Sequence, residues 1–580
     1  MARGAREFAR ARWEEFCGKP FGCLLRLFLG RMFQGSGESG AEGLDLSVAV
    51  FVILLGLPGL MVSLLMFEKY GSLIRFIRGE GPFDPLASTV PDEYFFIALS
   101  MTVTGAAALW KWDSIFLDRH DFLNLVPLPL KLRSIFLANL CAIFILVGLF
   151  TAVVNAASLI LVPVAVVGSQ GSLDLFIRYA AGHAVAVLVA SAFASFAVFA
   201  LVGAAMATLP TAAFAKVSAI VRFMVAVWLL VVLGSSFTVP DWLREMPVAE
   251  AHRLALLPPV SFLGVLRTVW GRAGAFEATM NRAGLGATGG ALAIAMLAYA
   301  LSFRRCFLRI PETADSGPLP RARLGGLRLP SLFNRVLRTP GQRAVWRFVS
   351  ATLLRNDGHR QVVLGFLALG LVAAANALTS LPNARALTEG STPPFAFLAM
   401  PFTLAYCLVA GIRFSFEMPS DLRANWIFQM WLDRERHEAR EVARRVILVF
   451  SLSWIAPACF AATLAFWGWK IALLHTATVV LCTAALVELL LLRFRKIPFT
   501  CPYPRFQSHS GLTVVAYLFG FLLFTDYLVE IEQWALAESW RIVCFAPILG
   551  AVAGGIYAYR KQMLEMDKEL VFDEARASGF

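Results

Sequence analysis

The chain has 580 residues, of which 58% are hydrophobic and only 16% are charged. Soluble proteins usually carry about 25% charged residues, so this composition argues against a soluble protein and favours an integral membrane protein. The net charge of +13 lies mainly between long apolar segments. It is therefore interpreted as a signal of membrane topology, and no nucleic-acid partner is expected.

The N-terminal part of the chain alternates basic and apolar side chains before the first apolar segment begins. Arg3 and Arg6 are followed by Phe8 and Trp13. Residues 1–45 are therefore predicted to form a cytoplasmic amphipathic segment on the inner leaflet, with arginines reaching the lipid phosphates. A solvated tail is the alternative.

Twelve apolar segments follow, and most have the length that a helix needs to cross about 30 Å of hydrocarbon. The first six are 46–67, 93–110, 135–163, 181–207, 218–236 and 288–303. The second six are 361–379, 394–412, 444–466, 471–492, 512–528 and 541–559. The expected fold class is an all-α polytopic membrane protein of about 12 transmembrane helices in two six-helix halves, with amphipathic cytoplasmic helices. Segment 288–303 is the weakest of the twelve, because it is short and begins near two glycines.

The distribution of lysine and arginine predicts the orientation of these spans. Basic residues concentrate in alternating connections, which the positive-inside rule places in the cytoplasm together with both termini. The predicted organisation is a first membrane half, an arginine-rich cytoplasmic linker with an amphipathic end, a second membrane half and a cytoplasmic tail, at 46–303, 304–360, 361–559 and 560–580.

Both halves contain a long charged connection after their second span. The first long connection covers residues 111–134 and the second covers 413–445. Their patterns are similar although their sequences are not identical, which is typical of the internal repeats of transporters. An internal duplication is therefore expected.

Motifs for catalysis or for metal binding are missing from the sequence. No G-x-x-x-x-G-K-[ST] phosphate loop occurs, and the nine cysteines form no C-x-x-C pair. The run from Asp118 to Asp121 lacks a second ligand cluster, so it is interpreted as a solvated or partner-facing loop. The chain is therefore not expected to be an enzyme or to hold a metal or cofactor.

Polar residues within spans usually indicate functional sites, and they are few here. The candidates are His183, Glu488 and Asp526. Glu488 is followed by Arg493 and Arg495, which could compensate its charge, and Asp526 is followed by Glu530 and Glu532 at the predicted outer mouth. None is an isolated carboxylate at the middle of a span, which weakens an ion-coupled mechanism.

The first long connection resembles the segment after the second span of ABC-2-type exporter permeases. In that family an acidic residue, an apolar run with a Leu-Pro-like end and basic residues precede the third span. The resemblance assigns a partner-coupling role to Asp118, Asp121, Asn124, Pro127, Pro129, Lys131 and Arg133, and by analogy to Asp421, Arg423 and Asn425 in the second half. The extended loop 237–287, with its Leu-Pro-Pro run at Leu257, is also similar to the family.

The resemblance implies the permease subunit of an exporter in the bacterial inner membrane. A separate ATPase subunit would bind the ATP and dock on the coupling residues, and the substrate would be amphiphilic or hydrophobic. Accessory subunits are possible partners besides the lipid bilayer. Two alternatives stay open: an ion-coupled secondary transporter, and a non-transporting membrane scaffold or enzyme subunit.

Overall fold

The computed structural model describes the chain at residues 20–33, 56, 59–64, 66, 69–70, 89–110, 125, 127–168, 172–245, 257–302, 339–379, 393–418, 420, 430, 438–492, 494, 496–500 and 510–566. Within these residues the secondary structure is helical, without strands. The chain divides into two compact units, Met1–Leu319 and Pro320–Phe580. The protein is an all-α membrane protein, in which eight of the described helices are long and apolar enough to cross a bilayer.

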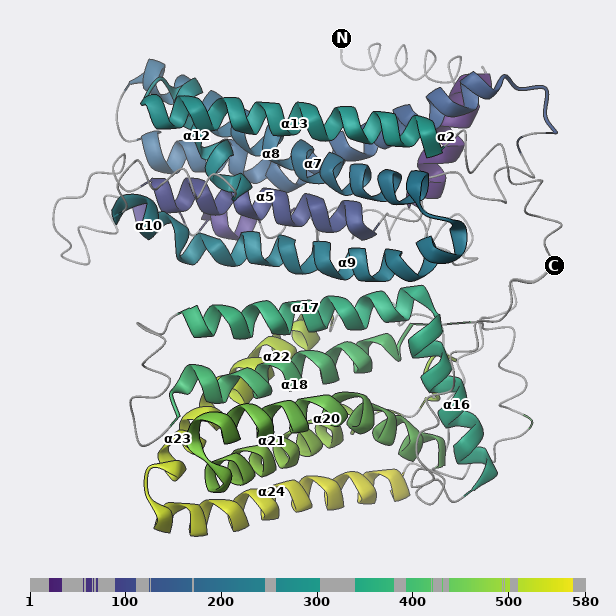
Figure 1. Cartoon of the computed structure of the whole chain (residues 1–580), viewed down its shortest axis with the longest axis vertical. Coiled ribbons are helices and arrows are strands. Elements are labelled where there is room, and N and C mark those ends of the chain that lie inside the picture. Colours follow the sequence, from purple (N-terminus) through teal and green to yellow (C-terminus); the bar gives the residue numbers. More distant parts are fainter. Residues whose placement is uncertain are drawn as a thin grey trace. The chain divides into compact units, whose positions relative to one another are not determined.

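The first unit is a bundle of long helices with short helices at its two ends. The long helices are α5 (Val90–Trp110), α7 (Leu132–Val167), α8 (Leu173–Thr208), α9 (Thr211–Gly234) and α13 (Ala275–Ser302). The short ones are α2 (Pro20–Phe33), the 3-10 turn η3 (Ser235–Phe237), α10 (Val239–Glu245) and α12 (Pro258–Trp270). Figure 1 shows α2 at one end of this bundle and α10 and α12 at the other.

Helices α5 and α8 form the centre of the first unit. Helix α5 packs on α7, α8, α9 and α12, and α8 also packs on α7, α12 and α13. Close approach depends on small residues: a Cβ at Gly182 of α8 would lie 2.8 Å from the carbonyl oxygen of Leu266 in α12. Helix α12 begins with proline at its first position and ends at Gly271, whose φ of 83° suits glycine.

The second unit is also a helical bundle. Its helices are α16 (Pro340–Arg355), α17 (Asp357–Thr379), α18 (Phe395–Ser415), α20 (Glu438–Trp467), α21 (Trp469–Leu490), α22 (Ser510–Leu522), α23 (Leu528–Leu536) and α24 (Ser539–Met566). A π-helical turn, η8 (Leu523–Tyr527), joins α22 to α23. Helix α16 runs across one end of this bundle, and α23 lies at the other end (Figure 1).

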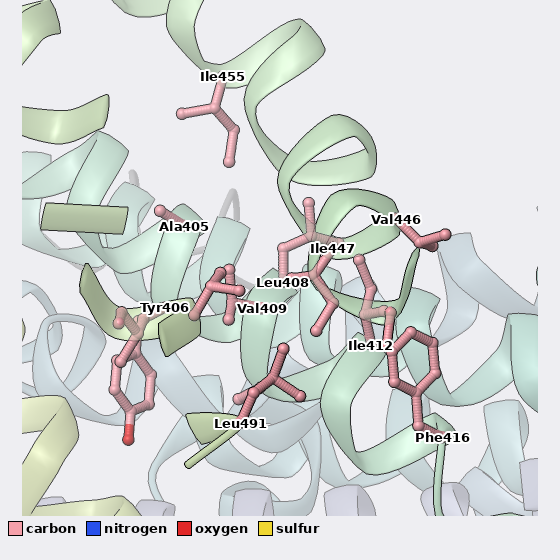
Figure 2. Packing of buried hydrophobic residues seen from close by; sticks show 14 of the residues in the cluster. Ala405, Tyr406, Leu408, Val409, Ile412, Phe416, Val446, Ile447, Ile455 and Leu491 are labelled. Carbon is pink, nitrogen blue, oxygen red and sulfur yellow. The ribbon is translucent and has the colours of Figure 1, made fainter. Parts of the chain in front are cut away.

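Helix α18 is the central helix of the second unit. It packs on α17, α20, α21, η8 and α23. Figure 2 shows the core around it, where Leu408, Val409 and Ile412 of α18 face Ile447 of α20 and Leu491. Between α20 and α21 only Gly468 is non-helical, and its φ of 82° lets the chain reverse within a single residue.

Most of the predicted spans overlap a described helix, several of which begin earlier, whereas the first predicted span, 46–67, lies mostly outside the described residues. The eight candidate spans include α5, α7, α8 and α13 in the first unit and α17, α18, α20 and α21 in the second. The weak segment 288–303 is the second half of α13, which begins at Ala275, so part of the predicted outer loop 237–287 is helical.

Candidate functional site

The described part of the first long connection is anchored in the core of the first unit. Leu125 is 5% exposed and belongs to one hydrophobic cluster with Leu24 and Phe28 of α2, Ala108 of α5 and Ile135 of α7. Helix α2 itself packs against α7 through its apolar face. The connection is therefore held between the amphipathic helix and the ends of two long helices.

The residues that follow Leu125 are exposed and form a basic, apolar surface. Pro127, Pro129, Lys131 and Arg133 are all exposed, and Leu128 is 49% exposed. The Leu128 backbone N–H donates to the Leu125 carbonyl oxygen over 3.3 Å, which fixes the turn. The predicted coupling residues Asp118, Asp121 and Asn124 lie outside the described residues.

The described start of the second long connection is partly buried, with Phe414 55% exposed and Ser420 exposed. Asp421, Arg423 and Asn425 lie outside the described residues, but Arg413 and Phe416 before them are described. Arg413 donates to Glu417 over 2.6 Å and stacks on Phe494 at 4.5 Å, and Phe416 is 3% exposed.

His183 lies in the apolar interior of the first unit. It is completely buried in α8, packs edge-on against Phe96 of α5, and neither of its ring nitrogens has a hydrogen-bond partner. A group of polar residues from three helices is buried in the same interior. Ser100 donates to Asn155 over 2.5 Å, and Asn155 donates to Ser191 over 3.1 Å, so a hydrogen-bonded network joins α5, α7 and α8.

Glu488 forms a buried charge network in the second unit. It accepts hydrogen bonds from Arg444 of α20 and, over 2.7 Å, from Arg560 of α24, which is 2% exposed. Arg560 also lies 3.7 Å from Glu441. Arg493 and Arg495, which the sequence suggested as partners, lie outside the described residues. The geometry makes Glu488 a link between α20, α21 and α24.

Asp526 lies half-buried in the π-helical turn η8, and Glu532, six positions later, belongs to a buried pair. Glu532 of α23 accepts a hydrogen bond from Nδ1 of His475 in α21 over 2.9 Å, with both side chains buried. Nε2 of His475 and Oε2 of Glu532 have no hydrogen-bond partner. The sequence placed both His475 and Glu532 near the predicted outer ends of their spans, but it did not pair them.

A further buried ion pair lies at the end of the first unit that holds α12, and sequence reasoning missed it. Glu93 at the start of α5 is 1% exposed and accepts a hydrogen bond from Arg267 of α12 over 2.9 Å. The ring of Trp270 is contacted by two guanidinium groups, those of Arg267 at 4.9 Å and Arg272 at 4.7 Å. Glu93 is the first residue of the predicted span 93–110 and is followed directly by an apolar run, and a carboxylate in that position was the available signal.

The described residues contain no group of three or more metal-ligating side chains. Comparisons with protein-family models, with curated proteins and with solved structures found no match to the chain.

Proposed function

We propose that the chain is the permease subunit of an ATP-driven exporter of the ABC-2 type, with about twelve spans in two six-span halves. A separate ATPase subunit would supply the energy by docking on the first long connection. The substrate would be an amphiphilic or hydrophobic molecule that moves through the bundle from the inner leaflet side.

The observation that carries the proposal is the surface from Pro127 to Arg133. Leu125 anchors this surface between α2, α5 and α7, while Pro127, Leu128 and Pro129 are presented outward. Two prolines restrict the backbone of this surface. A movement of the docked ATPase subunit would therefore displace α5 and α7, because the loop between them is too rigid to deform instead. An exposed leucine beside Lys131 and Arg133 suits an acidic, partly apolar protein surface.

The two-halves proposal is supported by the same order of helix packing in each unit. Helices α5 and α18 each contact the next two long helices, α7 and α8 in one unit and α20 and α21 in the other. Helices α8 and α21 contact the last helix, which is α13 or α24. The amphipathic helices α2 and α16 pack on the third predicted spans, α7 and α20.

The short helices before the last spans also correspond. Helix α12 packs on α5, α8 and α13, and α23 packs on α18, α21 and α24. Each of these short helices is hydrogen-bonded to the start of the second predicted span in its half. Arg267 of α12 donates to Glu93 of α5, and Gln533 of α23 donates to the carbonyl oxygen of Pro393, just before α18, over 3.2 Å. This correspondence is expected of an internal duplication.

The proposed orientation places α2, the first long connection and both termini in the cytoplasm of a bacterial inner membrane. The support is the concentration of basic residues in the connections at that end. The exposed Lys131 and Arg133 lie there, at the start of α7. The residues between α7 and α8, such as Ser172, would then face outward.

An ion-coupled transporter is the second candidate, and the His475–Glu532 pair favours it. The pair is buried and titratable, and each partner keeps one polar atom without a hydrogen bond. Glu488 supports this candidate less well, because Arg444 and Arg560 already compensate its charge. Uptake of a substrate by proteoliposomes under a proton gradient, without ATP, would favour this candidate.

Purification from native membranes tests the leading proposal. A subunit that hydrolyses ATP and contains a Walker A sequence should copurify with the chain. Leu128→Asp should reduce its recovery at least about tenfold, because an apolar contact is replaced by a desolvated charge. Leu173→Asp is the matched control, since Leu173 is 73% exposed at the opposite end of the same unit. Absence of any ATPase, or equal recovery with both variants, would contradict the proposal.

A further inference from the structure

We propose that the exposed face of α16 binds the phosphates of anionic phospholipids in the headgroup layer of the bilayer. This α16 face consists of Arg343, Arg347, Leu354 and Arg355, all of which are exposed. The proposal goes beyond the exporter function, because it depends neither on an ATPase subunit nor on which side of the membrane the two termini occupy.

Helix α16 is amphipathic, and its charges all have one sign. Its other side is buried in the hydrophobic core of the second unit through Val345, Trp346, Val349 and Leu353. The sequence of the helix contains three arginines and no acidic residue, so no carboxylate one turn away on the same helix can compensate them. The α16 face therefore presents uncompensated positive charge along its own helix.

Both ends of α16 lie where a long apolar helix begins. Near its start, Gln342 accepts a hydrogen bond from Arg445 of α20 over 3.4 Å, and the predicted span 444–466 begins there. At its other end, two residues separate Arg355 from the apolar stretch Gly358–Ala375 of α17. A helix with both ends at this level lies along the membrane surface, and Figure 1 shows α16 running across the end of its bundle. The α16 face is therefore at the depth of the lipid headgroups.

Two described carboxylates at this end of the unit are already paired with other arginines. Glu417, just after α18, accepts a hydrogen bond from Arg413 over 2.6 Å. Glu441, in the first turn of α20, lies 3.7 Å from both Arg444 and Arg560. Neither carboxylate therefore compensates the arginines of the α16 face, which suits an anionic partner from outside the chain.

The composition of the α16 face favours a lipid over a protein as that partner. Leu354 is 46% exposed on the same side of the helix as Arg347, and Phe414 at the end of α18 is 55% exposed. A helix in the interface directs such apolar side chains toward the acyl chains, while its guanidinium groups reach the phosphates. Guanidinium binds phosphate through two parallel hydrogen bonds, and each basic residue near an anionic membrane surface strengthens binding.

Photo-cross-linking in nanodiscs tests the proposal on the full chain without a partner subunit. A photoreactive amino acid replaces Leu354, and the nanodiscs contain equal amounts of phosphatidylglycerol and phosphatidylcholine. Mass spectrometry measures the ratio of the two lipids attached at this position. We expect phosphatidylglycerol to be attached at least about tenfold more often, because the neighbouring arginines attract its charge. No attached lipid, or a ratio near one, would overturn the proposal.

Two double variants separate the charge of the α16 face from its shape. Arg347→Gln with Arg355→Gln should lower the ratio at least about fivefold, whereas the corresponding pair of lysine substitutions should retain most of it, since lysine keeps the charge. Arg282→Gln is the matched control, because Arg282 is an exposed arginine of α13 in the other unit, and it should leave the ratio unchanged. Equal losses for the glutamine and lysine pairs would contradict phosphate binding.

The same photoreactive residue at position 354 in native membranes tests for a protein partner. We expect lipid adducts and no protein adduct. Capture of an ATPase or of another protein at this position would assign the α16 face to a protein and overturn the proposal. Such a result would leave the proposed role of the Pro127–Arg133 surface uncontradicted, so the two proposals can fail independently.

Discussion

Buried charges in this protein join helices that are distant in sequence. Glu488 could be predicted as a noteworthy residue, because a carboxylate in an apolar segment is costly and rarely without a role. Its partners could not be predicted. Arg444 lies 44 positions before it and Arg560 lies 72 positions after it, and only the packing of α20, α21 and α24 brings them together. The same holds for Glu93 and Arg267, which are 174 positions apart.

The Glu488 network should contribute strongly to stability. Glu488→Leu leaves the buried guanidinium of Arg560 with only the more distant Glu441, so we expect a loss of about 3–5 kcal/mol in the free energy of unfolding. Titration with sodium dodecyl sulfate in mixed micelles measures it. Asp174→Ala, which breaks the exposed Arg178–Asp174 pair, should change the free energy by no more than about 1 kcal/mol. Equal effects of the two variants would show that the network is not buried.

The His475–Glu532 pair should behave as a coupled unit. His475→Phe or Glu532→Leu alone leaves one buried polar partner, at a cost of about 3–5 kcal/mol. The double variant removes both groups, so it should be less destabilised than either single variant. The same unfolding titration gives the four free energies of this cycle. A double variant destabilised by the sum of the two singles would mean that the groups do not interact.

At the scale of the element, hydropathy predicted where the long helices are but not where they begin. Helix α8 begins at Leu173, whereas the predicted span begins at residue 181, because Asp174 and Arg178 in its first turns are polar. Helix α13 begins at Ala275 for the same reason, with Glu277 before the apolar part. A hydropathy window measures the membrane-embedded part of a helix, and a helix continues into the interface wherever its backbone stays hydrogen-bonded.

Helix α12 depends on a glycine for its contact with α13. A Cβ at Gly264 would lie 2.6 Å from Cβ of Met280 and 2.7 Å from the carbonyl oxygen of Glu277. Gly264→Ala should therefore force the helices apart and lower the free energy of unfolding by about 1–3 kcal/mol. Gly289→Ala in α13 is the control, since no atom lies within 4 Å of its added Cβ and alanine favours the helix. The free energy of unfolding of Gly289→Ala should be unchanged or slightly raised. A decrease equal to that of Gly264→Ala would contradict the close packing of α12 on α13.

At the scale of the whole molecule, composition was sufficient to predict an all-α membrane protein. The number of spans is not confirmed, because only eight of the described helices are long and apolar enough to cross a bilayer and the first predicted span, 46–67, lies mostly outside the described residues. The candidate coupling surface was foreseen as a motif. Its anchoring through Leu125 was not foreseen, because a hydrophobic cluster between α2, α5 and α7 depends on tertiary packing. Sequence pattern thus located the surface, and packing supplied a physical reason for its role.

The proposed topology has a direct consequence for reporter fusions. Alkaline phosphatase, which is active only after export, should be active when inserted at Ser172 or at Gly468 and inactive at Leu209, between α8 and α9. The reason is that these connections lie on opposite sides of helices that each cross the bilayer once, with the basic connections retained inside. A fluorescent protein at the C-terminus should fluoresce, since it folds in the cytoplasm. Phosphatase activity at Leu209 together with inactivity at Ser172 would invert the first unit. It would place the Pro127–Arg133 surface outside, where no ATPase could reach it.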